Sequence, residues 1–174
     1  MKKILVILLM SLSLISCKTL TSDEVTFEEY EGEALNFAVV GEIPLVREEN
    51  VTFTKVTLEG LLISDVSTYD GIFITKENQE KASDEQYKDL FISGQCFILI
   101  DPEEHFMEFT EIELGYVRPK DASTYGYMTV FQRINEKEMR FNELDLYNDE
   151  VSEGHIEACY SVLFDLISDR RNES

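Results

Sequence analysis

Short apolar runs separated by polar turns dominate the first two thirds of the chain. Each run is rich in β-branched and aromatic residues and stops at a turn signal such as Gly41 or Asp101-Pro102, which is typical of β-strands. The predicted strands are Leu35–Val40, Val51–Val56, Gly71–Thr75 and Gln95–Ile100. The last two runs lack polar alternation, which indicates central parallel strands buried on both faces. Thr57–Ile63 predicts a short helix or turn that joins the second and third strands.

A helix is predicted between the third and fourth strands. Ser83–Gln86 matches a capping box, in which the first and last side chains satisfy backbone N–H groups at a helix start. Tyr87, Leu90 and Phe91 would then share one face of the helix. The segment from Gly71 to Ile100 therefore predicts a strand–helix–strand unit with parallel strands and a right-handed crossover.

The last third of the chain predicts a hairpin followed by a long helix. Tyr125–Phe131 and Met139–Leu146 alternate apolar and polar residues across the polar residues 135–138, a pattern typical of an antiparallel hairpin. Apolar residues then recur at helical spacing, which predicts a helix over Glu153–Ser168 that packs on the sheet. The residues that carry this spacing are Ile156, Tyr160, Leu163, Phe164 and Ile167.

The order of predicted elements favours one fold class. It is strand, strand, short helix, strand, helix, strand, hairpin and helix, which fits a layered α/β domain with a mainly parallel β-sheet, flanking helices and an antiparallel hairpin addition. We find no internal repeat and no second domain, so we expect a single α/β globular domain over residues 34–174. Residues 17–33 are rich in acidic and hydroxyl side chains and are predicted to form an acidic tether, with a cation-binding arm as the alternative.

The first residues of the chain combine positive charge with an uncharged apolar run. Lys2 and Lys3 precede the run from Ile4 to Ser16, which is an export signal pattern. The run is too short for a transmembrane helix, because crossing the bilayer core needs about 20 apolar residues. No Ala of the A-x-A type precedes Ala34, which counts against an ordinary secretory cleavage site.

The apolar run ends in Leu14-Ile15-Ser16-Cys17, which resembles the lipobox of bacterial membrane lipoproteins. The resemblance implies a signal peptide over residues 1–16, cleavage just before Cys17 and a diacylglyceryl group on the sulfur of Cys17. It also implies a lipid anchor on the extracytoplasmic face of the bacterial cell envelope. Two acyl chains on one Cys provide the two signals that stable anchoring requires. The resemblance covers about a tenth of the chain and transfers no activity to the mature domain.

The charge balance narrows the classes of partner. The chain has 15 Lys and Arg against 35 Asp and Glu, for a formal net charge of −20. This charge excludes nucleic acid, whose binding depends on neutralising phosphates, and it repels anionic lipid, so the anchor alone must hold the chain at a membrane. It favours cationic partners, namely a basic protein, a polyamine or a divalent cation.

A cluster of candidate ligands follows the fourth predicted strand. Asp101, Glu104, His105 and Glu108 lie close together in sequence, at a position where α/β domains place ligands beyond the carboxyl ends of parallel strands. These side chains form a candidate site for a divalent cation if three or four of them converge. The alternative is a solvated acidic loop, and we assign no metal or cofactor.

The sequence leaves the role of two further groups of residues open. Cys96 and Cys159 lie in apolar segments, and they form a disulfide if the last helix crosses the fourth strand, or remain buried thiols otherwise. Tyr116, Tyr125 and Tyr127 lie in or beside a long connection after Phe109, where they line a recognition surface or pack in the core.

The functional prediction follows from what the chain contains and lacks. The nucleophile elbow, phosphate-binding loop, dinucleotide fingerprint and zinc-protease motifs are absent from the sequence. We therefore predict a membrane-anchored extracytoplasmic binding or interaction module. The alternative is a cell-envelope hydrolase that uses Asp101 and Glu104 as paired carboxylates.

Overall fold

A mixed six-stranded sheet organises the protein. The computed structural model describes residues 26–115 and 126–172, and the strands lie in the order β2-β1-β3-β4-β5-β6. They are β1 Leu35–Val40, β2 Val51–Val56, β3 Gly71–Ile74, β4 Cys96–Ile100, β5 Met128–Asn135 and β6 Glu138–Leu144. The first four strands in this order pair in parallel, and β5 and β6 join antiparallel. The predicted α/β domain, with its mainly parallel sheet and antiparallel hairpin, is confirmed.

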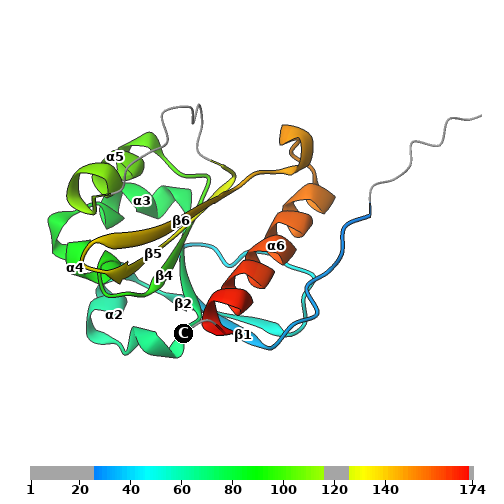
Figure 1. The fold of residues 1–174 in the computed structure, drawn as a ribbon, viewed down its shortest axis with the longest axis horizontal. Coiled ribbons are helices and arrows are strands. Elements are labelled where there is room, and N and C mark those ends of the chain that lie inside the picture. Colours follow the sequence, from blue (N-terminus) through cyan, green and yellow to red (C-terminus); the bar gives the residue numbers. More distant parts are fainter. Residues whose placement is uncertain (1–25, 116–125, 173–174) are drawn as a thin grey trace, which may run out of the picture.

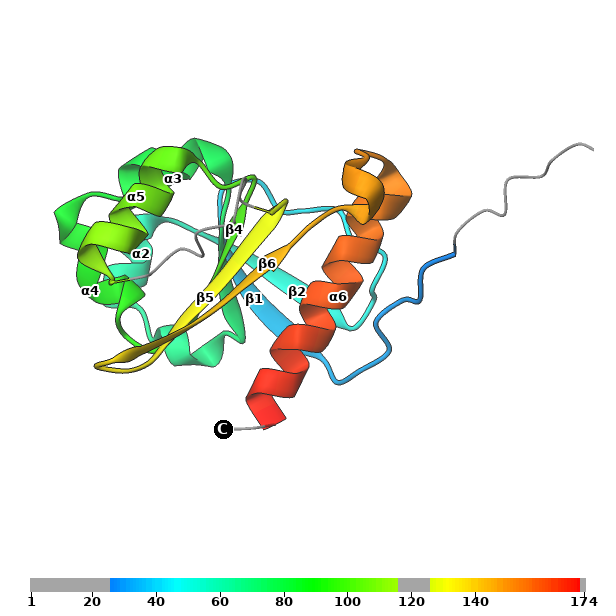
Figure 2. The same ribbon diagram turned by 45° about the horizontal axis from the view of Figure 1, so that its top comes forward.

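Helices cover both faces of this sheet (Figure 1). They are α2 Leu58–Ile63, α3 Lys76–Ala82, α4 Lys88–Phe91, α5 Glu104–Glu113 and α6 Glu153–Asn172. Among these helices, α6 lies on one face, and α2 to α5 gather on the other, as the turned view in Figure 2 also shows. None of the helices in residues 26–115 and 126–172 combines the length and the apolar character that a membrane span needs.

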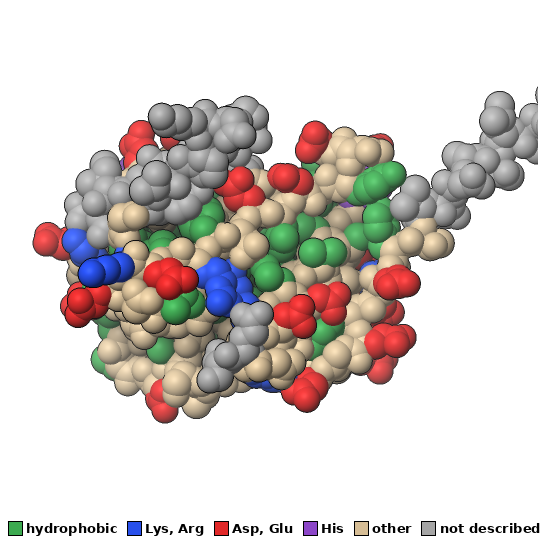
Figure 3. Space-filling view, viewed as in Figure 1, with side chains coloured by type: hydrophobic (Ala, Val, Ile, Leu, Met, Phe, Trp, Pro, Cys, Tyr) green, Lys and Arg blue, Asp and Glu red, His purple; other side chains and the backbone are tan. Residues whose placement is uncertain are grey.

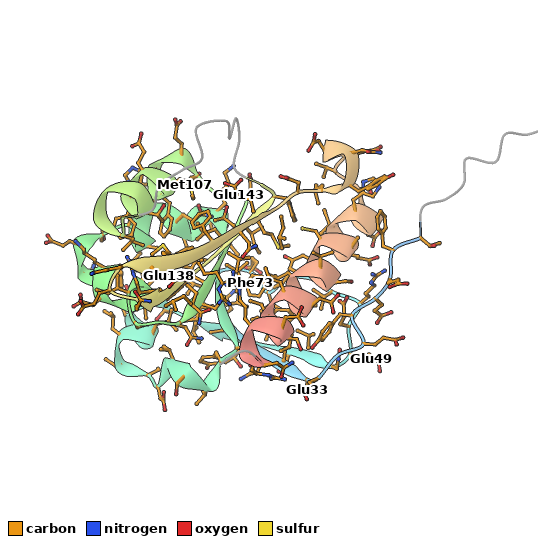
Figure 4. All side chains as sticks on the ribbon, viewed as in Figure 1. Glu33, Glu49, Phe73, Met107, Glu138 and Glu143 are labelled. Carbon is orange, nitrogen blue, oxygen red and sulfur yellow. The ribbon has the colours of Figure 1, made fainter. Side chains whose placement is uncertain are left out.

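Two apolar clusters form because neighbouring residues of a strand point to opposite faces. In β1, Ala38 and Val40 join the cluster beneath α2 to α5, whereas Phe37 and Val39 join the cluster beneath α6. Aromatic rings fill both clusters, since Phe91 and Phe97 lie 4.7 Å apart between ring centroids in the first, and Phe37 and Phe73 lie 5.2 Å apart in the second. Figure 4 shows Phe73 between the sheet and α6 and Met107 on the side of α5.

The predicted capping box at Ser83–Gln86 is wrong. Ser83 follows the last residue of α3, where its backbone N–H donates to the carbonyl of Gln79 at 3.1 Å. The predicted helix with Tyr87, Leu90 and Phe91 on one face is present as a 3-10 turn followed by α4, and all three side chains are buried. A further helix, α3, precedes it from Lys76, and its inward-facing Gln79 is fully buried. The Gln79 amide donates to Ile100 O at 2.9 Å and accepts from Glu103 N at 2.8 Å. A buried, satisfied Gln occupies a core position, so the apolar spacing of this helix is not visible in the sequence.

The segment after β4, for which the sequence offered a cation site or a solvated acidic loop, is instead mostly helical. Helix α5 spans Glu104–Glu113 and buries Phe106, Met107 and Phe109 against the sheet. Its acidic residues masked this apolar stripe in the sequence. The hairpin, the short helix α2 and the long helix α6 lie where they were predicted, and α6 continues to Asn172.

Candidate functional site

The carboxyl ends of β1, β3 and β4 meet at one edge of the sheet, which we call the carboxyl edge. Strand β1 is flanked by β2 and β3, so the chain reverses its direction of travel across the sheet between β1 and β3. In α/β domains such a switch point is the usual place for a ligand. Here it is filled by protein, because a Cβ atom on Gly41 would lie 1.8 Å from Thr75 Oγ1.

Hydrogen bonds fix the residues that fill the switch point. Thr75 Oγ1 lies 3.2 Å from the carbonyl of Val40 and donates to Glu77 Oε1 at 2.5 Å. Asn78 Nδ2 donates to Thr75 Oγ1 at 3.1 Å. Since these polar groups satisfy one another, the switch point is a closed structural junction between β1 and α3.

The candidate cation ligands after β4 do not form a cluster. Asp101, in a left-handed conformation with φ 47°, accepts a hydrogen bond from Lys76 Nζ at 2.7 Å, and this bond raises the pKa of Lys76. His105 Nε2 lies 2.9 Å from Ser83 Oγ. Glu104 and Glu108 lie on α5. Within residues 26–115 and 126–172, no group of three His, Cys, Asp or Glu side chains is placed to hold a metal ion.

A groove of about 530 Å³ lies beside the carboxyl edge, on the side of α6. We call it the edge groove. Its apolar lining comes from three segments that are distant in sequence: the loop after β1, the residue before β5, and the start of α6. These residues are Pro44, Leu45, Val46, Tyr127, Val151, Ile156 and Tyr160. Ser152, Glu153 and Glu157 are the polar residues of its lining.

The rim of the edge groove exposes large apolar side chains. Leu45 is 92% exposed and Val151 is 77% exposed, whereas Tyr160 is buried at its base. Apolar side chains this exposed on a folded domain mark an interaction surface when they border one cavity. In Figure 3 acidic side chains spread over the visible face of the molecule, and hydrophobic side chains are exposed beside the start of α6.

The polar groups near the edge groove are suited to hydrogen bonding. Burial raises the pKa of Tyr127, and the neighbouring Cys159 and Asp101 add to this effect. Burial raises the pKa of Tyr160 as well, and it raises the pKa of Cys159 to about 12, with a contribution from Asp145. These groups stay protonated at neutral pH, so they can donate hydrogen bonds but do not act as a base or a thiolate nucleophile.

The disulfide that the sequence left open is not formed. Cys96 and Cys159 are both buried and free. Cys96 Sγ lies 3.5 Å from Nη1 of Arg170, which is eleven residues after Cys159 on α6, or about 16 Å along the helix axis. Burial raises the pKa of Cys96 to about 11, although Arg170 opposes this shift.

The sequence predicted one residue of the edge groove. Tyr127 lines it and also packs, partly buried, against the cluster beneath α6, whereas Tyr116, Tyr125 and the predicted lipidation residue Cys17 lie outside the described residues. The loop after β1 offered a sequence signal for the groove, since Ile43 and Leu45 are large apolar residues in an otherwise polar loop. Comparison with protein-family models, curated proteins and solved structures found no match to this chain.

Proposed function

We propose that this protein is a lipid-anchored lipoprotein of the bacterial cell envelope whose layered α/β domain binds a cationic, amphipathic protein segment in the edge groove. The anchor is the diacylglyceryl group on Cys17 that the lipobox implies. The observation that carries the binding role is the edge groove itself, which combines an apolar lining with Glu153 and Glu157 on a chain of net charge −20.

Charge and apolar surface favour a basic protein over the other cationic partners. The acidic field attracts any cation, but a divalent ion needs converging carboxylates, and the described residues offer no such group. A polyamine would leave the exposed side chains of Leu45 and Val151 uncovered. A segment that carries both Lys or Arg and apolar side chains satisfies the glutamates and covers this rim.

The hydrolase alternative gains no support from the described residues. Asp101 is paired with Lys76, and neither Asp101 nor Glu104 lines the edge groove. A general acid and base need a shared cavity in which both reach the substrate. We therefore propose no catalytic role for Asp101 and Glu104.

Peptide binding tests the proposed function. The unlipidated Cys17→Ala chain is titrated with a peptide of alternating Lys and Leu, and with peptides in which Glu replaces Lys or Ser replaces Leu. We expect measurable binding of the Lys–Leu peptide alone, weakened by added salt. Replacing both groove glutamates, as Glu153→Gln with Glu157→Gln, should weaken binding by about fivefold to thirtyfold, because partly exposed ion pairs contribute about 0.5 to 1 kcal/mol each.

A matched variant separates the groove from the overall charge. Glu80 and Glu136 are exposed and lie on α3 and in the turn of the hairpin, away from the edge groove. Glu80→Gln with Glu136→Gln changes the net charge equally and should leave binding within about twofold. Equal weakening by the two double variants, or equal binding of the three peptides, would contradict a site in the groove.

A further inference from the structure

Residues 27–33, which we call the strap, lie bound along the domain instead of hanging free. Tyr30 is 3% exposed, and its ring centroid lies 5.9 Å from that of Phe164 on α6. Its hydroxyl donates to the carbonyl of Glu33 at 2.7 Å. The predicted tether is thus divided, since its second half belongs to the packed structure.

Contacts from the loop between β1 and β2 and from α6 hold the strap. Arg47 Nη2 donates to the carbonyl of Glu28 at 2.7 Å, and Asn50 Nδ2 donates to the carbonyl of Gly32 at 2.8 Å. Near the end of α6, Arg171 pairs with Glu33. These bonds are spread along the whole strap, so its path along the domain is fixed from Glu33 back to Glu28.

The first residue of the strap lies at the groove end of the molecule. The ring of Phe27 contacts Tyr147 at 5.4 Å and His155 at 5.6 Å between centroids. In the sequence these two residues lie on either side of Val151, which lines the edge groove, and with Phe27 they line a separate cavity at the start of α6. Figures 1 and 2 show the described chain starting beside α6, whereas the turn between β5 and β6 lies at the opposite end.

A short linker from Cys17 to Phe27, which we call the leash, joins the anchor to the strap. Ten peptide units join Cys17 to Phe27, and they span at most about 35 Å when fully extended and about 20 Å as a flexible chain. Helix α6 alone, with 20 residues, is about 30 Å long. As a flexible chain this leash is shorter than α6, so it keeps the end of the domain to which it is attached nearest the anchor.

We infer that the strap turns the edge groove toward the bilayer, so that the groove receives a basic segment held at the surface of the same membrane. This inference rests on the proposed function. It makes the partner a membrane-associated protein, because only such a partner presents its basic residues within reach of a groove held close to the lipid. Lipid itself is disfavoured as the occupant, since Glu153 and Glu157 in the lining repel anionic headgroups.

Energy transfer to a lipid acceptor measures the orientation. The mature chain is coupled through the Cys17 thiol to a maleimide lipid in vesicles, so the result does not depend on natural lipidation. Cys96 and Cys159 are buried and stay unreacted. A donor dye is placed on an azide-bearing amino acid that replaces either Leu45 or Glu136, and the acceptor is a headgroup-labelled lipid. We expect the transfer efficiency from position 45 to be roughly twofold or more that from position 136, because the domain is at least as long as α6, about 30 Å.

Two further measurements complete the test. A flexible Gly/Ser insert of about 20 residues between Val25 and Thr26 leaves the domain unchanged and should reduce the difference between the two positions, because the leash then exceeds the body. Equal transfer from both positions without the insert, or greater transfer from position 136, would overturn the orientation. Quenching of the dye at position 45 by nitroxides deep in the acyl chains would overturn the protein partner, because lipid would then occupy the groove.

The orientation and the proposed function fail in different ways. Failure of the Lys–Leu peptide to bind the soluble chain removes the groove function and leaves the transfer result intact. Equal transfer with intact peptide binding removes the orientation alone.

Discussion

Replacing Gly41 and Gly154 by alanine should change the free energy of unfolding in opposite directions. Gly41 has a φ of 128°, and its missing Cβ would lie 1.8 Å from Thr75 Oγ1, so Gly41→Ala should lower the free energy of unfolding by about 2 to 3 kcal/mol. Gly154 lies in α6 with no atom within 4 Å of a built Cβ, so Gly154→Ala should raise it by about 0.5 to 1 kcal/mol. Urea denaturation measures both, and similar changes in the two variants would contradict the closed switch point.

The two buried thiols predict a loss of stability at alkaline pH. Burial raises the pKa of Cys96 to about 11 and that of Cys159 to about 12, above the value of about 8.5 for an unfolded chain. The folded state therefore binds protons more tightly than the unfolded state, so their contribution is complete below about pH 8.5 and is lost as the pH rises toward about 12.

The measurement for the thiols is urea denaturation across this range of pH. The parent chain for this comparison carries Cys17→Ala, and the variant adds Cys96→Ala and Cys159→Ala. The variant should be less stable at neutral pH but should lose less stability between pH 8 and pH 11. Parallel stability curves for parent and variant would show that the thiols do not titrate in this way.

At the scale of elements, the strap should be part of the cooperative fold. Tyr30 is 3% exposed and Tyr147 is 45% exposed. Each has an aromatic contact, Tyr30 with Phe164 and Tyr147 with Phe27. Tyr30→Ala should lower the free energy of unfolding by about 3 to 4 kcal/mol, whereas Tyr147→Ala should cost less than about 1 kcal/mol. If Tyr30→Ala costs no more than Tyr147→Ala, the strap is a loosely attached segment, and the orientation of the groove loses its basis.

The elements that the sequence predicted correctly are those with a clear apolar pattern, either a continuous run or a regular spacing. Strands β3 and β4 are buried runs, and α6 repeats its apolar residues over several turns. Helix α3 was missed because Gln79 occupies its buried position, and α5 because carboxylates surround its aromatic stripe. Hydrophobic periodicity reveals only apolar core positions, so it does not reveal a buried polar residue whose hydrogen-bond partners lie far along the chain.

The edge groove was less predictable than the fold. Its lining unites Leu45, Tyr127 and Tyr160, which are separated by tens of residues and meet only because β1, β5 and α6 converge at one edge. The acidic cluster after β4 was more conspicuous in the sequence, yet pairing with Lys76 and the start of α5 prevent it from forming a site. Proximity in sequence is thus a weaker guide to a site than the order of strands in the sheet.

At the scale of the whole molecule, self-repulsion should make stability depend on salt. A net charge of −20 disfavours the compact state, and salt shortens the range of this repulsion. The melting temperature should rise by several degrees between about 20 mM and about 300 mM sodium chloride, because the Debye length falls from about 20 Å to about 6 Å. A melting temperature that falls with salt would show that the attractive ion pairs dominate.

The central claim is that the chain is held outside the cytoplasm by lipid on Cys17. The most direct measurement is mass spectrometry of the native N-terminal peptide, together with membrane fractionation of the wild type and of Cys17→Ala. The account predicts a peptide that begins at Cys17 and carries a diacylglyceryl-sized addition, and release of the variant from the membrane. A native chain that retains Met1, bears an unmodified Cys17 and fractionates with the cytoplasm would contradict it.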